Sequence, residues 1–495
     1  MNRNKNENKK RITAIVSLAV FIFAGLSAAA VIFITDTRTD YAVSASLDTE
    51  SMTLQTVTAV NYKNDTGATL NEIKFNLYAN AFREGAAVKP YFESDLKISF
   101  PDGMNYGEAT VKSVRSGGNA LSYSVNGKDK NVLTVALGKP LKNRLSAKIE
   151  IACDLRLPKT NMRLGYYGGI INLTNFFPSV CVFENGAFTE CLYLPTGDPF
   201  YSETADFKVE LRTDGDYKVA HSGDLKSEKT ENGGKIFKFE GKKIRDFALV
   251  LSESFVVKTV KSGGVTLKYF AEAGSGAENA ETKLAATESA LNFFGDYYFK
   301  YPYKTYCVAE TYLAAGGMEY PNLSLISRDL KEADKDTVIV HETAHQWWYG
   351  IIGNDNLNYA WMDEGLAEFS VELYFAKNGR TLKANEYRHF NLRESRRFDE
   401  IIRDLGGSPV MEKYLGDFVS NYEYVAVTYS RGHLLFADVY ETLGDENFRK
   451  AMRYYAKKNK YRIARKNDML DAFNKYADGD MRTLFGEWTN FSKKY

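Results

Sequence analysis

The sequence changes its hydrophobic period once, and this change constrains the fold more than any other feature. Between residues 41 and 257, short stretches such as Phe207–Leu211 alternate apolar and polar residues, which is typical of half-buried strands. From Lys331 onward the pattern is that of helices. We therefore expect a multidomain α+β protein, with an antiparallel β-rich domain at 36–257 and a mainly helical domain at 258–495.

A long apolar run precedes both domains. Residues 1–11 carry five basic side chains, and residues 12–34 contain no charge. A helix of this length spans about 30 Å of hydrocarbon, and a basic flank stays in the cytoplasm. We expect a cytoplasmic tail at 1–11, a single-pass anchor at 12–35 that contacts the bilayer through 12–34, and domains outside the cell membrane. A cleaved signal peptide is the alternative, with a cleavage site near Ala28–Ala30.

Composition excludes several classes of protein. Sixty-four Lys and Arg residues balance 63 Asp and Glu residues, which argues against a nucleic-acid binder that works by bulk charge. A hydrophobic content of 44% excludes disorder as the main state. Four cysteines are too few for a disulfide scaffold, although Cys181 and Cys191 could bridge a local loop. Oligomeric state is left open.

The segment His341-Glu342-Thr343-Ala344-His345 carries the clearest chemical signal. Residues four apart on a helix share one face, so two imidazoles can bind one zinc ion. Glu342 follows the first histidine, where it can take a proton from water that the metal activates. The alternative is a pair of ordinary histidines on a helix.

A carboxylate at a usable distance supports the metal site. Glu364 lies 19 residues after His345, and a second helix packed against the first brings it to the same metal. Two imidazoles and one carboxylate leave a coordination position open, which is typical of catalytic zinc. Glu368 lies one turn further on and is expected to accept the outer N–H of a ligand histidine; an ordinary solvated glutamate is the alternative.

These motifs together resemble the gluzincin aminopeptidase family. The resemblance rests on the zinc motif with Glu364, on Gly316-Gly317-Met318-Glu319-Tyr320, which is similar to the family's G-x-M-E-N motif, and on Tyr429-Ser430-Arg431-Gly432, which is similar to its Tyr-x-Lys-Gly. Asp198-Pro199-Phe200 and Arg245-Asp246-Phe247-Ala248 resemble its β-domain sequences.

The resemblance implies a thermolysin-like catalytic domain with one Zn²⁺ and peptide substrates. It implies that Glu342 is the general base and that Tyr429 donates a hydrogen bond to the oxyanion. Glu319 is expected to bind the substrate's α-ammonium, while Gly316, Gly317 and Met318 line the peptide. The implied activity is removal of N-terminal residues.

Three departures from the family leave alternatives open. Tyr320 replaces the usual Asn, which places side-chain selectivity in question. The family's Gln-x-Glu has no counterpart: Phe176-Phe177-Pro178 occupies the region, with Glu184 or Glu190 as substitutes. The family's large C-terminal helical domain is also missing from the sequence, which predicts a more open cleft. A zinc endopeptidase and a non-catalytic peptide-binding surface protein are the competing functions.

The remaining histidines and two tryptophans are expected to be structural. His433 follows Tyr429 by four residues and is interpreted as a packing or supporting residue rather than a substrate contact. His221 and His389 lack metal spacing. Trp347 and Trp348 are expected in the core.

Overall fold

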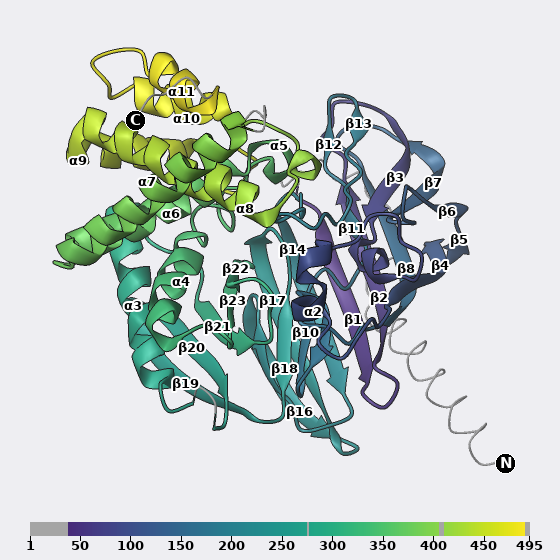
Figure 1. Ribbon diagram of the computed structural model, residues 1–495. Coiled ribbons are helices and arrows are strands. Elements are labelled where there is room, and N and C mark those ends of the chain that lie inside the picture. The colour runs from purple at the N-terminus through teal and green to yellow at the C-terminus, as the bar shows by residue number, and fades with distance from the viewer. Residues whose placement is uncertain (1–37, 275–276, 405–409, 491–495) are drawn as a thin grey trace, which may run out of the picture.

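The computed structural model describes residues 38–274, 277–404 and 410–490. In these ranges a β-rich unit, coloured purple to teal, lies beside a unit whose helices are green to yellow (Figure 1). The proposed tail and anchor, 1–35, lie outside the described residues. Among the residues that are described, no helix is both long and apolar enough to cross a membrane.

The β-rich unit contains one large sheet and three small ones. In spatial order, the large sheet consists of β16 (Asp224–Glu231), β17 (Gly234–Ile244), β14 (Ala205–Thr213), β1 (Asp40–Asp48), β2 (Thr53–Lys63), β8 (Ser146–Arg156), β4 (Glu108–Ser116) and β5 (Asn119–Ala120). The small sheets consist of β15 (Lys218–His221), β18 (Leu249–Ser252), β10 (Ile170–Leu173) and β9 (Gly165–Tyr167); of β11 (Ser179–Val180), β3 (Leu70–Asn76), β7 (Val132–Leu141) and β6 (Tyr123–Asn126); and of β12 (Phe183–Glu184) and β13 (Ala187–Phe188).

Alternating residues make these strands one-sided, as the sequence predicts. Phe207, Val209 and Leu211 of β14 are buried, and alternate residues of β1 are buried along the strand. Strand pairs in this unit are antiparallel, except that β1 runs parallel to β14. The expectation of an antiparallel β-rich N-terminal domain is confirmed.

The second unit combines a mixed sheet with helices. Its sheet has the order β19 (Phe255–Ser262), β20 (Val265–Glu272), β21 (Thr305–Thr311), β23 (Leu323–Ser327) and β22 (Gly317–Met318). Its longer helices are α3 (Ala280–Tyr297), α4 (Glu332–Ala344), α6 (Trp361–Lys377), α7 (Thr381–Asp404), α9 (Arg431–Asn459), α10 (Lys466–Asn474) and α11 (Arg482–Thr489). The proposed boundary at residue 257 falls inside β19, which pairs with β20.

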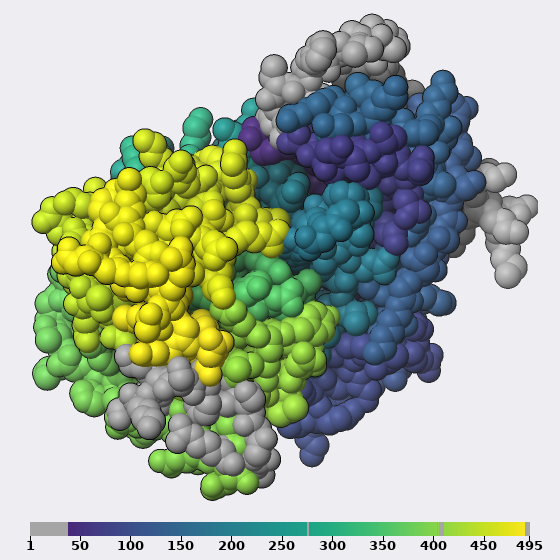
Figure 2. Space-filling view, turned by 90° about the horizontal axis from the view of Figure 1, so that it is seen from above, coloured from purple at the N-terminus to yellow at the C-terminus, as the bar shows by residue number. Residues whose placement is uncertain are grey.

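Short helical turns complete the two units. The β-rich unit contains η1 (Tyr78–Phe82), η2 (Glu93–Asp95) and α2 (Leu96–Ser99). The second unit contains α5 (Asn356–Tyr359), η3 (Leu415–Asp417), α8 (Asn421–Tyr424) and the π-helix η4 (Val425–Ser430). The two units meet along a broad seam on the face shown in Figure 2.

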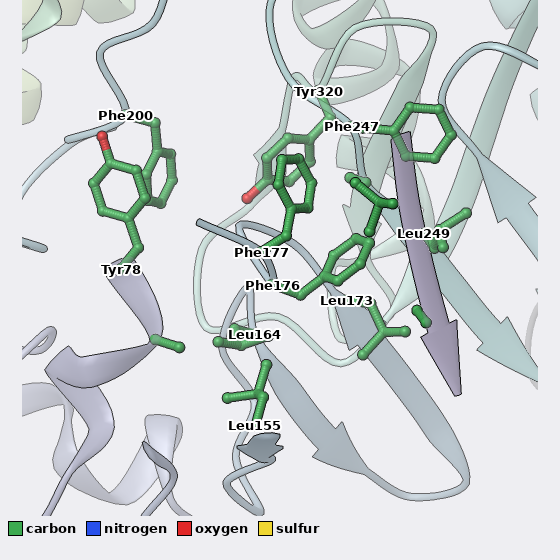
Figure 3. Packing of buried hydrophobic residues seen from close by; sticks show 14 of the residues in the cluster. Tyr78, Leu155, Leu164, Leu173, Phe176, Phe177, Phe200, Phe247, Leu249 and Tyr320 are labelled. Atoms are coloured by element: carbon green, nitrogen blue, oxygen red, sulfur yellow. The ribbon is translucent and has the colours of Figure 1, made fainter. Parts of the chain in front are cut away.

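The hydrophobic core of the β-rich unit continues into the mixed sheet. The same buried cluster includes Phe176, Phe177 and Phe200 of the first unit and Met318 and Tyr320 of the second. Figure 3 shows Tyr320 next to Phe177 within this cluster. A second cluster fills the helical unit and contains Trp347 and Trp348, as expected. Because the first core crosses the boundary, the two units are held together by apolar packing.

The cysteines of the chain are free thiols. Cys181 and Cys191 are both buried and both lie near Asn76, whose Oδ1 is 3.3 Å from the Cys181 Sγ and 3.3 Å from the Cys191 nitrogen. The disulfide that their spacing allowed is therefore not formed. Cys153 and Cys307 are buried core residues, as the sequence indicated.

Candidate metal centre and active site

Three side chains meet at one point: His341 of α4, His345 directly after the end of α4, and Glu364 of α6. The Nε2 atoms of His341 and His345 are 2.9 Å apart, and Glu364 Oε2 lies 3.3 Å and 3.1 Å from them. A tetrahedral zinc ion with bonds of about 2.0–2.1 Å has ligand atoms about 3.3 Å apart. The three atoms thus fit three corners of a zinc site and leave the fourth corner open.

Outer contacts orient both histidines. His345 Nδ1 lies 2.8 Å from the backbone oxygen of Trp348, so this nitrogen carries the proton and Nε2 is left to bind metal. His341 Nδ1 lies 2.9 Å from Glu368 Oε1. The Tyr387 hydroxyl donates to the other Glu368 oxygen at 2.6 Å, which holds that carboxylate in place. Glu368 therefore occupies the supporting position that the sequence suggested.

The electrostatics of the cluster favour a cation. Burial acts to lower the pKa of His341, but Glu364 and Glu368 outweigh it and raise this pKa to about 10. Burial acts to raise the pKa of Glu364, but His345 and His341 leave it lowered. The carboxylates thus stabilise positive charge at the point where the two imidazoles meet, which is what a divalent metal supplies.

Glu342 lines a cavity of about 430 Å³, which His341 and Glu364 also line. Its side chain is buried, and its Oε2 has no hydrogen-bond partner among the residues that the structure describes. Burial raises the pKa of Glu342 to about 8. A Cβ on Gly317 would lie 2.2 Å from Glu342 Oε1, so any larger residue would force this carboxylate to move from its position.

Tyr429 lies across the cavity on η4. A π-helix turn is uncommon and often occurs at functional sites. The Tyr429 ring stacks on the ring of His341 with centroids 5.8 Å apart, and the residue lines the cavity. Burial and the charge of Glu364 raise the pKa of Tyr429 well above its usual range, so its hydroxyl stays protonated and can donate.

The mixed sheet supplies the remaining predicted residues. β22 is an edge strand that pairs with β23 on one side only, and it holds Gly317 and Met318. Gly316, Gly317 and Glu319 line the cavity, whereas Met318 is fully buried beneath it. Glu319 is buried, and burial raises its pKa to about 8. Within the described part of the chain, its Oε1 has no hydrogen-bond partner.

Three further cavity residues were missed by sequence reasoning: Arg163, Asp198 and Tyr424. Asp198 stands in a quoted family-like segment, but no spacing rule linked it to the zinc motif. Tyr424 precedes Tyr429 by five residues and contacts its ring edge-on at 5.6 Å. Arg163 had no signal in the sequence, because its partner Asp198 is 35 residues away and meets it only in the fold.

Tyr320, Glu184 and Glu190, which the sequence raised as candidates, do not line the cavity. Tyr320 is fully buried and its hydroxyl reaches Asn175 Oδ1 at 3.3 Å, so it packs between the units and does not line the cavity. Glu184 pairs with Arg465, and Glu190 pairs with Lys74. Neither glutamate lines the cavity, so neither substitutes for the missing Gln-x-Glu there.

The other histidines have structural partners. His433 is fully buried, and its Nε2 lies 2.8 Å from Glu372 Oε2. His221 is buried with Nδ1 3.2 Å from the Gly223 oxygen, and burial lowers its pKa to about 4. His389 lies 2.7 Å from the Asn385 oxygen on α7.

We expect Glu368→Ala to lower zinc affinity about 10- to 100-fold, because it removes the carboxylate that orients His341. Competition with a chromogenic chelator measures this affinity. Glu372→Ala is the matched control: this glutamate lies one turn further along α6 and pairs with His433 instead of a metal ligand. Equal losses of zinc affinity in the two variants would contradict the orienting role.

Comparison with known proteins agrees with this geometry. Residues 282–488 match the model of the peptidase family M1 domain. The chain is 22% identical over 298 residues to leucyl aminopeptidase of Saccharolobus solfataricus, an alignment that covers 57% of this chain and 38% of that protein. It is 22% identical over 404 residues to aminopeptidase N of Lactobacillus helveticus, with 77% and 46% covered. The chain thus spans less than half the length of these relatives.

A solved structure of nearly equal length has the same fold. The M1 zinc metallopeptidase of Deinococcus radiodurans superposes with a TM-score of 0.65 at 15% identity, covering 93% of this chain and 95% of that one. The family model spans α4, α6 and η4, which carry the metal ligands, Glu342 and Tyr429. Residues 282–488 thus resemble a peptidase family M1 domain, and the relatives that the chain matches are aminopeptidases.

Proposed function

We propose that the protein is a zinc-dependent aminopeptidase that hydrolyses N-terminal residues from peptides. The observation that carries the proposal is Glu319, a buried carboxylate that lines the same cavity as His341 and Glu364 and whose Oε1 has no hydrogen-bond partner in the described ranges. A buried carboxylate is costly unless a cation pairs with it, and the free N-terminus of a peptide is such a cation. An endopeptidase has no use for a cation site at this position.

The distance from Glu319 to the metal centre favours removal of a single residue. One carboxylate oxygen of Glu319 lies within 4.8 Å of one oxygen of Glu364. From the α-nitrogen of a peptide to its first carbonyl carbon there are two bonds of about 1.5 Å each, and a second residue adds about 3.3–3.6 Å. An ammonium held at Glu319 therefore places the first peptide bond, not the second, beside the metal ligands.

The chain's own groups supply the proton transfers. When bound, zinc supplies a Lewis acid that makes water more acidic and polarises a carbonyl group. Glu342 accepts the proton of the attacking water and passes it to the leaving nitrogen, because its free Oε2 faces the cavity from the residue next to His341. The neutral Tyr429 hydroxyl donates to the carbonyl oxygen as negative charge develops there.

The backbone holds the rest of the substrate. β22 is the edge strand of the mixed sheet, so its outer edge is free to pair with a peptide in extended conformation. Gly317, on this strand, has no side chain to obstruct the peptide or Glu342.

The function is tested with the zinc-loaded full chain, one short peptide and the same peptide with an acetylated N-terminus. We expect only the free peptide to be cut. Glu342→Gln and Tyr429→Phe should each lower kcat about 100-fold or more, because each removes a group that acts in the transition state. Cleavage of both peptides would indicate an endopeptidase. Cleavage of neither, with zinc bound, would favour the peptide-binding protein.

Gly317→Ala should lower kcat at least about tenfold, because the added methyl occupies the space of the Glu342 carboxylate. Gly316→Ala is the matched control, since a Cβ at Gly316 meets no atom within 4 Å. Steady-state kinetics and thermal unfolding separate the effects. Similar kcat values in the two variants, with both chains folded, would contradict the proposed position of the base.

We also propose that residues 12–34 anchor the protein in the cell membrane, with residues 1–11 in the cytoplasm and the catalytic domain outside. The uncharged run and its basic flank support this proposal. We expect the full chain to sediment with membranes and resist extraction by carbonate at high pH. A chain that carries Lys at positions 20 and 24 should lose this behaviour. Release of the unaltered chain by carbonate would contradict the anchor.

A further inference from the structure

A second carboxylate lies beside Glu319 at the metal end of the cavity. One carboxylate oxygen each of Asp198, Glu319 and Glu364 lies within 4.8 Å of the others. The exposed fractions of these residues are 6%, 3% and 3%, so water does little to screen their charges. Glu364 has the two histidines as partners, whereas Glu319 Oε1 has none. The space between Asp198 and Glu319 therefore favours a positively charged ligand.

Arg163 neutralises only part of this charge. Its guanidinium pairs with Asp198 and also donates to the Gly197 oxygen at 3.2 Å. Its Nε lies 3.0 Å from the Met318 sulfur, next to Glu319 in the chain. Arg163 thus holds the Asp198 loop against the segment that carries Glu319. One guanidinium cannot balance both Asp198 and Glu319, and among the described residues no hydrogen bond or ion pair joins Arg163 to the Glu319 carboxylate.

The backbone conformation at Gly197 helps to place Asp198 at the cavity. Gly197 has φ +59°, a conformation that favours glycine. A Cβ there would lie 2.6 Å from the Tyr424 hydroxyl oxygen, so the loop passes directly against Tyr424. The Tyr424 hydroxyl is buried, and no described residue forms a hydrogen bond with it. Both Gly197 and Tyr424 line the cavity, which means that the loop presents Asp198 to the space that the substrate enters.

We propose that Asp198 is a substrate-binding residue that holds the α-ammonium group of the peptide together with Glu319. The inference rests on the proposed aminopeptidase function and deepens it, since it assigns the second acidic group that neither Glu184 nor Glu190 provides. An ammonium group has three N–H donors and is best held by more than one acceptor. Arg163 is then a positioning residue that fixes Asp198 without filling the ammonium site.

The test measures binding to the zinc-loaded full chain with Glu342→Gln, which is expected to turn over the ligand at least about 100-fold more slowly. The probes are Ala-Ala-Ala and propanoyl-Ala-Ala, which has the same shape but lacks the amine. The free-amine preference is the ratio of their dissociation constants. We expect Asp198→Asn and Glu319→Gln each to lower this preference about tenfold or more, because each removes a charged acceptor. The double variant should lose less than the product of the two effects, since both groups hold one ammonium.

Asp363→Asn is the matched control. Asp363 is also buried and adjacent to Glu364, but its oxygens accept from Asn354 and Asn356, and it does not line the cavity. The free-amine preference of the chain with Asp363→Asn should equal that of the Glu342→Gln parent. Zinc content is measured for each variant, and one zinc per chain is expected throughout.

Other outcomes overturn the inference. If folded Asp198→Asn keeps the free-amine preference of the parent, or if it only loses zinc, then Asp198 positions Glu364 and does not bind the substrate. Two zinc ions per chain, falling to one in Asp198→Asn, would make it a metal ligand. If the parent shows no preference at all, the proposed function fails and this inference with it. If Asp198→Asn does not fold, a crystal structure of the parent with Ala-Ala-Ala decides: nitrogen within hydrogen-bond distance of Asp198 supports the inference, and nitrogen on Glu319 alone overturns it.

Discussion

The close contact between α6 and α9 is the constraint on which the active site depends. A Cβ on Gly365 would lie 2.6 Å from the Cα of Gly432, so two glycines let these helices approach at backbone distance. Gly365 follows the metal ligand Glu364, and Gly432 follows the turn that carries Tyr429. Because Glu364 and Tyr429 are both next to the contact, a side chain there would push the two helices apart and move Tyr429 away from Glu364. The buried Arg431–Asp399 ion pair, with atoms 2.7 Å apart, ties α9 to α7 beside it.

The β-rich unit contributes to this site in two ways. It supplies Arg163 and Asp198 to the cavity itself. It also supports the turn that follows α4, where Arg245 donates a hydrogen bond to the backbone oxygen of Tyr349 at 2.9 Å. Tyr349 has φ +126°, an unusual conformation for a residue with a side chain, and the buried guanidinium helps to hold it. The hydrophobic core that the two units share around Tyr320 fixes their relative position.

The change from Asn to Tyr at residue 320 has a structural explanation. Its ring packs near Phe200, with centroids 6.5 Å apart, and its hydroxyl reaches Asn175. Phe177, in the region where the family's Gln-x-Glu is missing, belongs to the same buried cluster. Phe177 and Tyr320 thus make this region part of the hydrophobic core. The acidic residues at the metal end of the cavity are Asp198, Glu319 and Glu364.

The sequence by itself determined the parts of this protein that depend on local periodicity. Helical spacing was enough to predict that His341 and His345 share one helix face and that Glu364 and Glu368 share another, because i and i+4 positions lie on one side of a helix. That the two pairs meet depends on the packing of α4 against α6. Alternation was enough to predict the β-rich unit. Only the tertiary structure decided that Asp198 and Arg163 enter the cavity, that Tyr320 does not, and that Cys181 and Cys191 remain free thiols. These outcomes depend on how distant segments pack, and no local period encodes a contact between the loop at Asp198 and the edge strand before Glu319.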